Sequence, residues 1–241
     1  MNLITELVIA NRILANEDVV DAYGHVSLRN PEAPERFFLA HSKSPALVEA
    51  GDIVEHTLDG AASKPEARPL YLERFIHAAI YEARPEVMAV VHAHAEDVLP
   101  FTITSEALRP VIHSGAFIGA EVPVWDIAER FGDGTNLLVT NIAQGRDLAK
   151  RLAGNSVALM RGHGFAAAAR SLIDVVRMSV YLPRNARVQF KAKQMGEFKP
   201  LSAGEIQARA AGTGYQPQSP ETQRAWQYWA QRAGCASLLK S

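Results

Sequence analysis

The chain has 241 residues, of which 48% are hydrophobic, and its formal net charge at pH 7 is −1. This length allows one large domain or two small ones with a sizeable core, and the balanced charge argues against a general nucleic-acid or anionic-membrane binder. The single cysteine, Cys235, excludes an internal disulfide framework and a cysteine-rich zinc site.

The first third of the chain predicts a helix followed by short strands. Apolar residues at helical spacing over 2–16, in an acidic segment, indicate an amphipathic helix and not a basic signal peptide. Apolar stretches over 23–29, 36–40 and 52–58, separated by turn residues, predict three strands. We expect a helix that begins at Pro69 and ends before Pro85. Its buried side would carry Leu72, Phe75, Ile76, Ala79 and Ile80.

The rest of the chain continues this alternation of strands and helices. After a strand that ends near residue 94, the pattern predicts a strand over 136–140, a helix over 145–153, a strand that carries His163, a helix over 171–195 that Pro183 must kink or break, and a final helix over 222–232. The alternation predicts an α/β fold: one domain over 1–241, with helices covering a central sheet and a helical extension from about residue 200. No apolar run approaches the roughly 20 residues of a membrane span, so we expect a cytoplasmic protein.

Two histidines stand at the end of the apolar stretch Val90-Val91-His92-Ala93-His94. Side chains of a strand alternate between its two faces, so His92 and His94 are expected to point the same way and to close on one ion. The alternative is a pair of solvent-facing histidines on a half-buried strand.

A third histidine follows a second apolar run, in Arg161-Gly162-His163-Gly164. Three neutral imidazoles with an open fourth position suit a catalytic divalent metal ion. We therefore predict one ion bound by His92, His94 and His163, as Mn²⁺ or Zn²⁺, with Fe²⁺ or Co²⁺ also compatible with these ligands.

Glu73 is the acidic candidate on the preceding helix. A carboxylate beside a metal pocket is partly desolvated and holds or passes a proton near neutral pH. His77, one turn later, would orient it, and the neighbouring Arg74 would clamp a substrate carboxylate. The alternative is an exposed glutamate that pairs with Arg74 or His77.

The order of helix glutamate, His-x-His strand and later Gly-His-Gly resembles the class II aldolase/adducin family, from about residue 3 to about residue 194. The resemblance implies a three-layer α/β/α sandwich, one divalent metal ion per subunit, and a cyclic homotetramer with active sites at subunit interfaces. In this comparison Glu73 matches the catalytic acid/base, and His92, His94 and His163 match the metal ligands.

The chain departs from the family's phosphosugar aldolases at the segments that cradle a phosphate. Tyr71-Leu72 stands where those enzymes carry paired serines before the helix glutamate, and the other two segments are Gly24-His25-Val26-Ser27 and His41-Ser42-Lys43-Ser44-Pro45. These changes resemble the family's decarboxylase branch, which acts on hydroxylated aromatic or pyridine dicarboxylates.

In that branch Glu73, together with His25, would transfer the ring proton, and Lys43, Ser44 or Arg74 would hold the remaining carboxylate. The alternative for His25 and Lys43 is a place on solvent-facing loops.

Two other functions are compatible with the same residues. An aldolase or epimerase acting on a sugar or sugar phosphate would keep the metal and Glu73, whereas a non-catalytic adducin-like scaffold would need neither. The aromatic C-terminal helix also has two interpretations: Trp226 and Trp229 share one face, which either packs on its own subunit or walls a neighbour's metal site.

Overall fold

The computed structural model describes residues 2–211 and 218–240. Its strands are β1 (His25–Arg29), β2 (Arg36–Ala40), β3 (Ile53–Thr57), β4 (Ala89–Ala93), β5 (Val124–Trp125), β6 (Val157–Met160) and β7 (Gly164–Ala169). Its α-helices are α1 (Leu3–Asn16), α2 (Arg74–Ala83), α3 (Pro100–Ile103), α4 (Ala128–Phe131), α5 (Ile142–Leu152), α6 (Leu172–Met195), α7 (Ala203–Ala211) and α8 (Pro220–Arg232). Short 3-10 helices are η1 (Pro45–Leu47), η2 (Ala50–Asp52), η3 (Glu96–Val98), η4 (His113–Ile118) and η6 (Leu238–Lys240).

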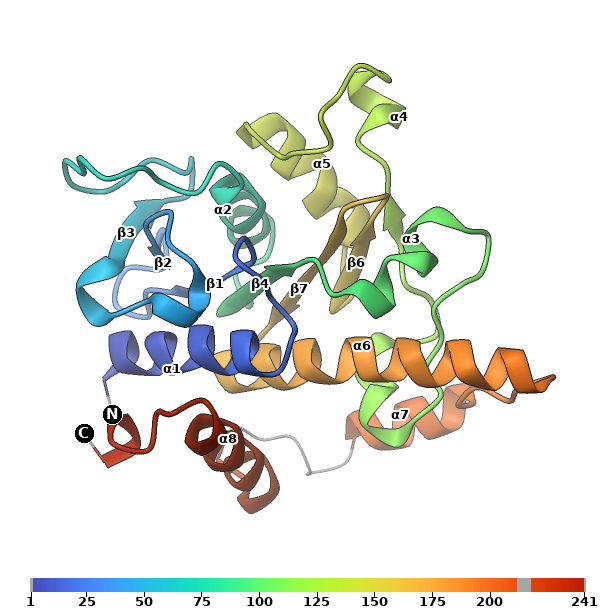
Figure 1. Cartoon of the computed structure of the whole chain (residues 1–241). Helices are drawn as coiled ribbons and strands as arrows, with labels where there is room; N and C mark the ends of the chain where they lie inside the picture. Colours follow the sequence, from blue (N-terminus) through green and yellow to red (C-terminus); the bar gives the residue numbers. More distant parts are fainter. Residues whose placement is uncertain (1, 212–217, 241) are drawn as a thin grey trace.

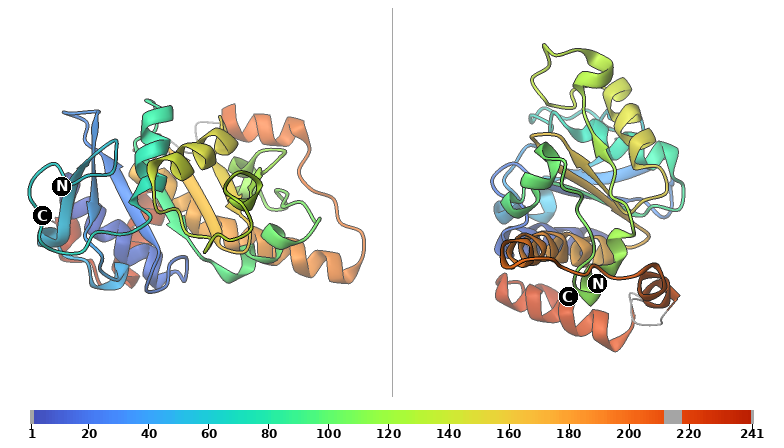
Figure 2. Two further views of the ribbon diagram at one scale, coloured as in Figure 1. Left: turned by 90° about the horizontal axis from the view of Figure 1, so that it is seen from above. Right: turned by 90° about the vertical axis from the view of Figure 1, so that its right-hand side faces the viewer.

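The strands form one sheet in the order β3-β2-β1-β4-β7-β6-β5. Neighbouring strands are antiparallel, apart from the parallel pair β5 and β6. Helices α1 and α6 lie along one face of the sheet, with α8 packed outside them, and α2 and α5 cover the other face (Figures 1 and 2). This arrangement confirms the three-layer α/β/α fold class.

Two apolar cores fill the spaces between the layers, and β7 contributes small side chains to both. Ala167 and Ala169 belong to the core under α1 and α6, whereas Ala166 and Ala168 belong to the core under α2 and α5. This assignment follows the alternation of side chains along a strand.

Helices α2 and α5 approach closely through a glycine, and this contact fixes the layer that carries Glu73. A Cβ atom on Gly145 of α5 would lie 2.3 Å from the carbonyl oxygen of Phe75 in α2. No side chain fits in that space, so only glycine allows the two backbones to touch here.

Three predicted elements differ from the structure near the histidines. Helix α2 begins at Arg74 and not at Pro69, so Glu73 is its N-cap residue, and Leu72 is 61% exposed and not on a buried helix face. The predicted strand over 136–140 is an irregular segment, and His163 lies in the turn between β6 and β7 and not on a strand. Contacts with neighbouring segments determine whether these residues form a helix, a strand or a turn. The local sequence pattern carries no information on those contacts.

The C-terminal third also differs from the sequence-based expectation. Helix α6 runs unbroken through Pro183, whose neighbours Val180 and Ala186 are buried in the core, so tertiary packing outweighs the lost helical hydrogen bond. Trp226 and Trp229 of α8 are buried in the chain's own core, against α1 and α6. Helix α7 has no counterpart among the elements that the sequence pattern predicts, and the single-domain assignment over 1–241 stays a prediction. None of the described helices is both long and apolar enough to cross a bilayer.

His56 of β3 is fully buried and stacks on Phe37 with ring centroids 5.2 Å apart. Burial lowers its pKa from 6.5 to about 4. The folded protein therefore holds His56 neutral where the unfolded chain takes up a proton, and this group's contribution to stability is complete above pH 6.5 and is lost as the pH falls toward 4.

We expect His56→Phe to weaken the acid-induced loss of stability. The shift corresponds to roughly 3 kcal/mol between pH 7 and pH 4, at about 1.36 kcal/mol per pKa unit. Urea unfolding across this pH range measures the effect, with the exposed His113→Phe as the matched control. A pH dependence equal in His56→Phe and the parent protein would contradict the assignment.

Candidate metal centre and active-site pocket

Three histidines and one glutamate converge near the end of β4. One ligand atom from each of Glu73, His92, His94 and His163 lies within 4.8 Å of the others. These residues come from the start of α2, the end of β4 and the turn after β6, so the fold unites segments distant in the sequence. The structure thus brings together the four residues that the sequence pattern singled out.

Strand β4 positions the first two histidines. His92 pairs with His25 of β1 and with Ala166 of β7, and its Nδ1 lies 3.0 Å from the carbonyl oxygen of Phe165. This contact turns its Nε2 toward the cluster, where it lies 3.0 Å from Nε2 of His94.

His94 has a carboxylate behind it. An oxygen of Asp21 lies 3.5 Å from Nδ1 of His94, on the side of the ring away from the cluster. A carboxylate in this position favours the tautomer that leaves Nε2 free for a metal ion. Asp21 is a residue that the sequence reasoning missed, because nothing in the local pattern links it to a histidine so far along the chain.

A close backbone contact positions the turn that carries His163. A Cβ atom on Gly164 would lie 2.2 Å from the carbonyl oxygen of Ala93, so only glycine lets this turn press on the end of β4. Thr102 also accepts a hydrogen bond from the Gly162 N–H at 3.0 Å. The glycines around His163 therefore have a structural role, although His163 is not on a strand.

Glu73 is held at both carboxylate oxygens. Its Oε1 accepts a hydrogen bond from the backbone N–H of Val139 at 2.9 Å, in the segment where a strand was expected. Its Oε2 lies 3.3 Å from Nε2 of His92 and 3.4 Å from Nε2 of His163. Burial by itself raises the pKa of Glu73, but the electrostatic interaction with His92 and the hydrogen bond with His163 outweigh it and hold the pKa below its usual value.

The donor set fits a divalent metal ion. Imidazole nitrogens about 2.1 Å from one ion, at tetrahedral angles, lie about 3.4 Å apart, close to the spacing of the Nε2 atoms of His92 and His94. Burial and the neighbouring His92 and His163 lower the pKa of His94 to about 4, so its ring is neutral at pH 7, as a metal ligand must be. The same donors suit Zn²⁺, Mn²⁺, Fe²⁺ and Co²⁺, and they do not choose among them.

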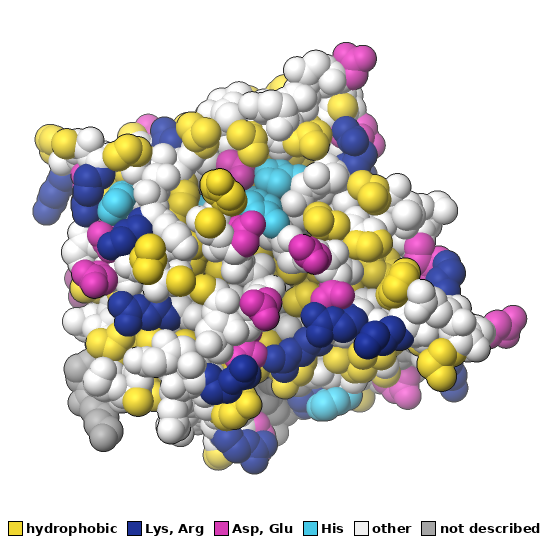
Figure 3. Space-filling view, viewed as in Figure 1, with side chains coloured by type: hydrophobic (Ala, Val, Ile, Leu, Met, Phe, Trp, Pro, Cys, Tyr) yellow, Lys and Arg dark blue, Asp and Glu magenta, His cyan; other side chains and the backbone are white. Residues whose placement is uncertain are grey.

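A cavity of about 580 Å³ opens beside this cluster. Histidine side chains reach the surface in the upper middle of the face in Figure 3, among hydrophobic and acidic groups. One wall is aromatic, because the rings of His25 and Tyr71 lie 4.6 Å apart. The lining also includes residues that the sequence reasoning did not name. The described lining residues are Asp21, Tyr23, His25, Ser42, Tyr71, Leu72, Glu73, His94, Leu138, Gly162 and His163.

The three predicted substrate-binding residues have other contacts. The ammonium of Lys43 lies 2.6 Å from Asp52, and Arg74 donates hydrogen bonds to the carbonyl oxygens of Gly60 and Tyr71. Ser44 precedes η1 as its N-cap residue, and Ser42 is the serine of that loop that lines the cavity. Their role toward substrate stays a prediction.

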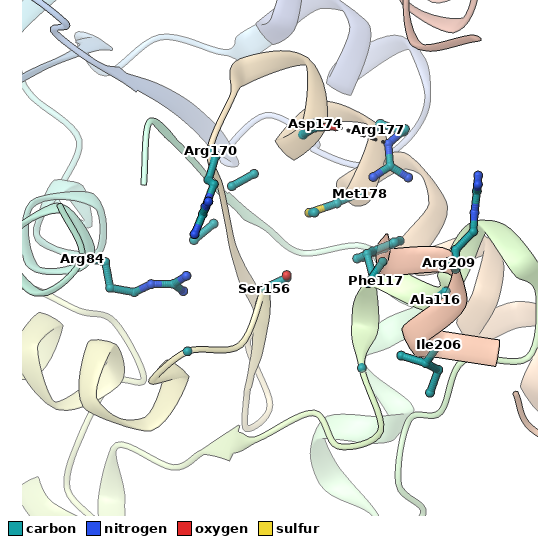
Figure 4. Close-up of a pocket in the computed structure, with 15 residues that line it drawn as sticks. Arg84, Ala116, Phe117, Ser156, Arg170, Asp174, Arg177, Met178, Ile206 and Arg209 are labelled. Atoms are coloured by element: carbon teal, nitrogen blue, oxygen red, sulfur yellow. Dashed lines mark ion pairs between the residues drawn. The ribbon is translucent and has the colours of Figure 1, made fainter. Parts of the chain in front are cut away.

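A second cavity of about 540 Å³ lies at the other end of β7 (Figure 4). Ala169 in its lining pairs with Ala89, at the end of β4 away from His92. Its charged groups include Arg177, which pairs with Asp174 at 3.7 Å. None of the four residues of the candidate metal centre lines this cavity, so the first cavity is the candidate active site.

Residues 5–190 match the family described as Class II Aldolase and Adducin N-terminal domain. Over 189 residues the chain is 42% identical to the decarboxylase tropJ of Talaromyces stipitatus, with 73% of this chain and 71% of that protein covered. It is 27% identical over 213 residues to a 3,4-dihydroxyphthalate decarboxylase of Arthrobacter keyseri, with 79% and 78% covered.

Solved structures share the fold at lower identity. An aldolase II superfamily protein from Pseudomonas syringae superposes with a TM-score of 0.80 at 21% identity, over 98% of this chain and 93% of the other. An L-fuculose 1-phosphate aldolase from Glaciozyma antarctica gives a TM-score of 0.76 at 21% identity, over 96% and 88%. At this identity the likeness supports the fold alone.

We expect His163→Ala to lose metal. Residues that only orient metal ligands already change metal affinity by roughly 10–100-fold, so removal of a ligand should cost at least as much. Elemental analysis after dialysis against Zn²⁺ or Mn²⁺ measures the bound ion, and the exposed His113→Ala is the control. Full metal occupancy in His163→Ala would contradict the ligand assignment.

Proposed function

This chain belongs to the decarboxylase branch of the class II aldolase and adducin family, and we propose that it removes a carboxyl group from a hydroxylated aromatic acid with one divalent metal ion per subunit. The observation that carries the proposal is the cluster of three imidazoles and one carboxylate at the edge of a cavity with an aromatic wall. Such a site combines a Lewis acid with a proton-transfer group.

The side chains that line the cavity support a flat aromatic substrate. Tyr71 and Leu72, which by the family resemblance replace the paired serines of the phosphosugar aldolases, line the cavity, and the ring of His25 lies against Tyr71. The two relatives with decarboxylase names, at 42% and 27% identity, support the reaction type. A hydroxylated aromatic or pyridine dicarboxylate is the substrate class that we propose.

Glu73 is the proposed proton carrier. Its lowered pKa keeps it ionised at pH 7, so it can accept the proton of the substrate hydroxyl. It then delivers that proton to the ring carbon that carries the carboxylate, which forms a β-keto acid. The bond to the carboxyl carbon breaks, carbon dioxide leaves, and its electron pair restores the aromatic ring as a phenolate that takes up a proton from solvent. A divalent ion, when bound by His92, His94 and His163, supplies a Lewis acid for negative charge on oxygen.

His25 is the second proposed catalytic residue. Its ring lines the cavity, and burial, with the charges of His77 and His92, lowers its pKa well below 6.5. A neutral imidazole at this position serves as a hydrogen-bond partner for the substrate while Glu73 moves the proton.

The family resemblance also supports a homotetramer with pockets near the subunit boundaries, which we include in the proposal. An adducin-like scaffold would not require Glu73 beside the three histidines His92, His94 and His163. That conjunction of residues favours an enzyme.

Glu73→Gln should retain the fold and the metal while kcat falls by about 10²–10⁴-fold, the usual contribution of a general acid or base. Steady-state kinetics with a hydroxylated aromatic dicarboxylate, together with elemental analysis, measures both effects. Glu86→Gln, at a partly exposed ion pair with Arg84, is the control. Turnover within a few-fold of the parent would show that another residue moves the proton.

We expect carbon dioxide release from hydroxylated aromatic dicarboxylates and slower or no turnover of sugar phosphates. The reason is that the large side chains of Tyr71 and Leu72 replace the paired serines with which the phosphosugar aldolases hold a phosphate. A panel of both classes, assayed with Mn²⁺ and with Zn²⁺, makes the comparison. Faster turnover of a phosphorylated ketose than of every aromatic acid would favour an aldolase instead.

A further inference from the structure

A chain of buried hydrogen bonds leads from the cavity wall into the core under α2. Nδ1 of His25 lies 2.6 Å from Nε2 of His77, and Nδ1 of His77 lies 2.6 Å from the hydroxyl of Ser27. The Ser27 hydroxyl lies 2.8 Å from the hydroxyl of Tyr81. All four side chains are at least 98% buried, so water does not compete for these bonds.

Both ring nitrogens of His77 take part in this series of hydrogen bonds, so neither is available to orient Glu73. The prediction that His77 orients Glu73 is wrong, because its partners are His25 and Ser27. Helix α2 therefore contributes to the site at two points: Glu73 reaches the histidine cluster, and His77 contacts His25, which lines the cavity.

The inner end of the chain favours one direction for the hydrogen bonds. Tyr81 has two acceptors within reach of its hydroxyl, Ser27 at 2.8 Å and the carbonyl oxygen of Met88 at 3.5 Å. The shorter bond is the better one, so Tyr81 donates to Ser27. If Tyr81 donates to Ser27, then Ser27 donates to Nδ1 of His77, and the proton of His77 lies on Nε2, which donates to Nδ1 of His25.

Arg29 fixes the position of Tyr81. Its guanidinium lies 4.7 Å from the centre of the tyrosine ring and donates to the Tyr81 carbonyl oxygen at 2.6 Å. Burial also lowers the pKa of His77 well below 6.5, which keeps its ring neutral, with one donor and one acceptor nitrogen. In a neutral ring, the direction of the hydrogen bond at one nitrogen therefore determines the direction of the bond at the other.

We propose that His77, Ser27 and Tyr81 are positioning residues that hold His25 in the tautomer with its proton on Nε2. Because Nδ1 of His25 is hydrogen-bonded to His77, Nε2 is the nitrogen of His25 that remains for a ligand in the cavity. His25 is then a fixed N–H donor toward an oxygen of the substrate that becomes more negative during the reaction. This refines the role of His25 within the proposed function, and rests on that function only for the identity of the substrate.

Nitrogen NMR of protein labelled with ¹⁵N-histidine tests the tautomer without any substrate. The Zn²⁺-loaded protein is compared with His25→Gln to identify the His25 signals. We expect the proton of His25 on Nε2 in the parent protein, and a mixed or reversed tautomer in Ser27→Ala and in His77→Leu. A proton on Nδ1 in the parent, or the same tautomer in all three proteins, would overturn the proposal.

Kinetics supply the second arm of the test. We expect kcat to fall by about tenfold in Ser27→Ala and by about 10²-fold in His77→Leu, with little change in KM, since one fixed donor to developing charge contributes roughly 10²–10³-fold. His77→Gln retains an amide that can donate to His25 and should recover most of kcat. Ser179→Ala removes another fully buried hydroxyl, from α6, and should leave kcat unchanged.

The two arms separate the proposal from the substrate assignment. If no aromatic acid is turned over, the proposed function fails, while the NMR result still decides the tautomer. Equal losses of kcat in Ser27→Ala and Ser179→Ala, or no recovery in a folded His77→Gln, would indicate general destabilisation and overturn the positioning role.

Discussion

Backbone contact between Gly164 and Ala93 holds the turn after β6 against the end of β4. The histidine cluster depends on this contact, because it brings His163 to two histidines about 70 positions earlier in the chain. The pairing of His92 with His25 on one side and with Ala166 on the other then fixes which face each ring occupies. A slip of one residue in this register would turn the ring of His92 to the opposite face of the sheet.

The second support of the site lies in the layer of α2 and α5. Gly145 lets α5 touch α2, and the irregular segment before α5 supplies the Val139 N–H that binds Glu73. The glutamate therefore receives its place from a backbone group 66 positions later in the chain. Together the two backbone contacts explain why a site made from distant segments can have a defined geometry.

Much of the site could be predicted from the sequence, because its residues follow local rules. The alternation of side chains along a strand predicts that His92 and His94 lie together, and the pattern around His163 predicts the third candidate ligand. The sequence could not predict that Lys43 pairs with Asp52, that Asp21 lies behind His94, or that His77 binds His25. These contacts join residues that are distant in the chain, and hydrophobic periodicity carries no information on such pairs.

The small side chains of β7 have an evolutionary consequence. Ala166 lies directly opposite His92, so its methyl group leaves the space that the imidazole occupies. The same residue belongs to the core under α2 and α5, where a larger side chain would separate the helix layer from the sheet. Selection for packing and selection for the histidine's position therefore act on one methyl group. A larger residue in place of Ala166 would therefore disturb the position of His92 and the packing of the helix layer together.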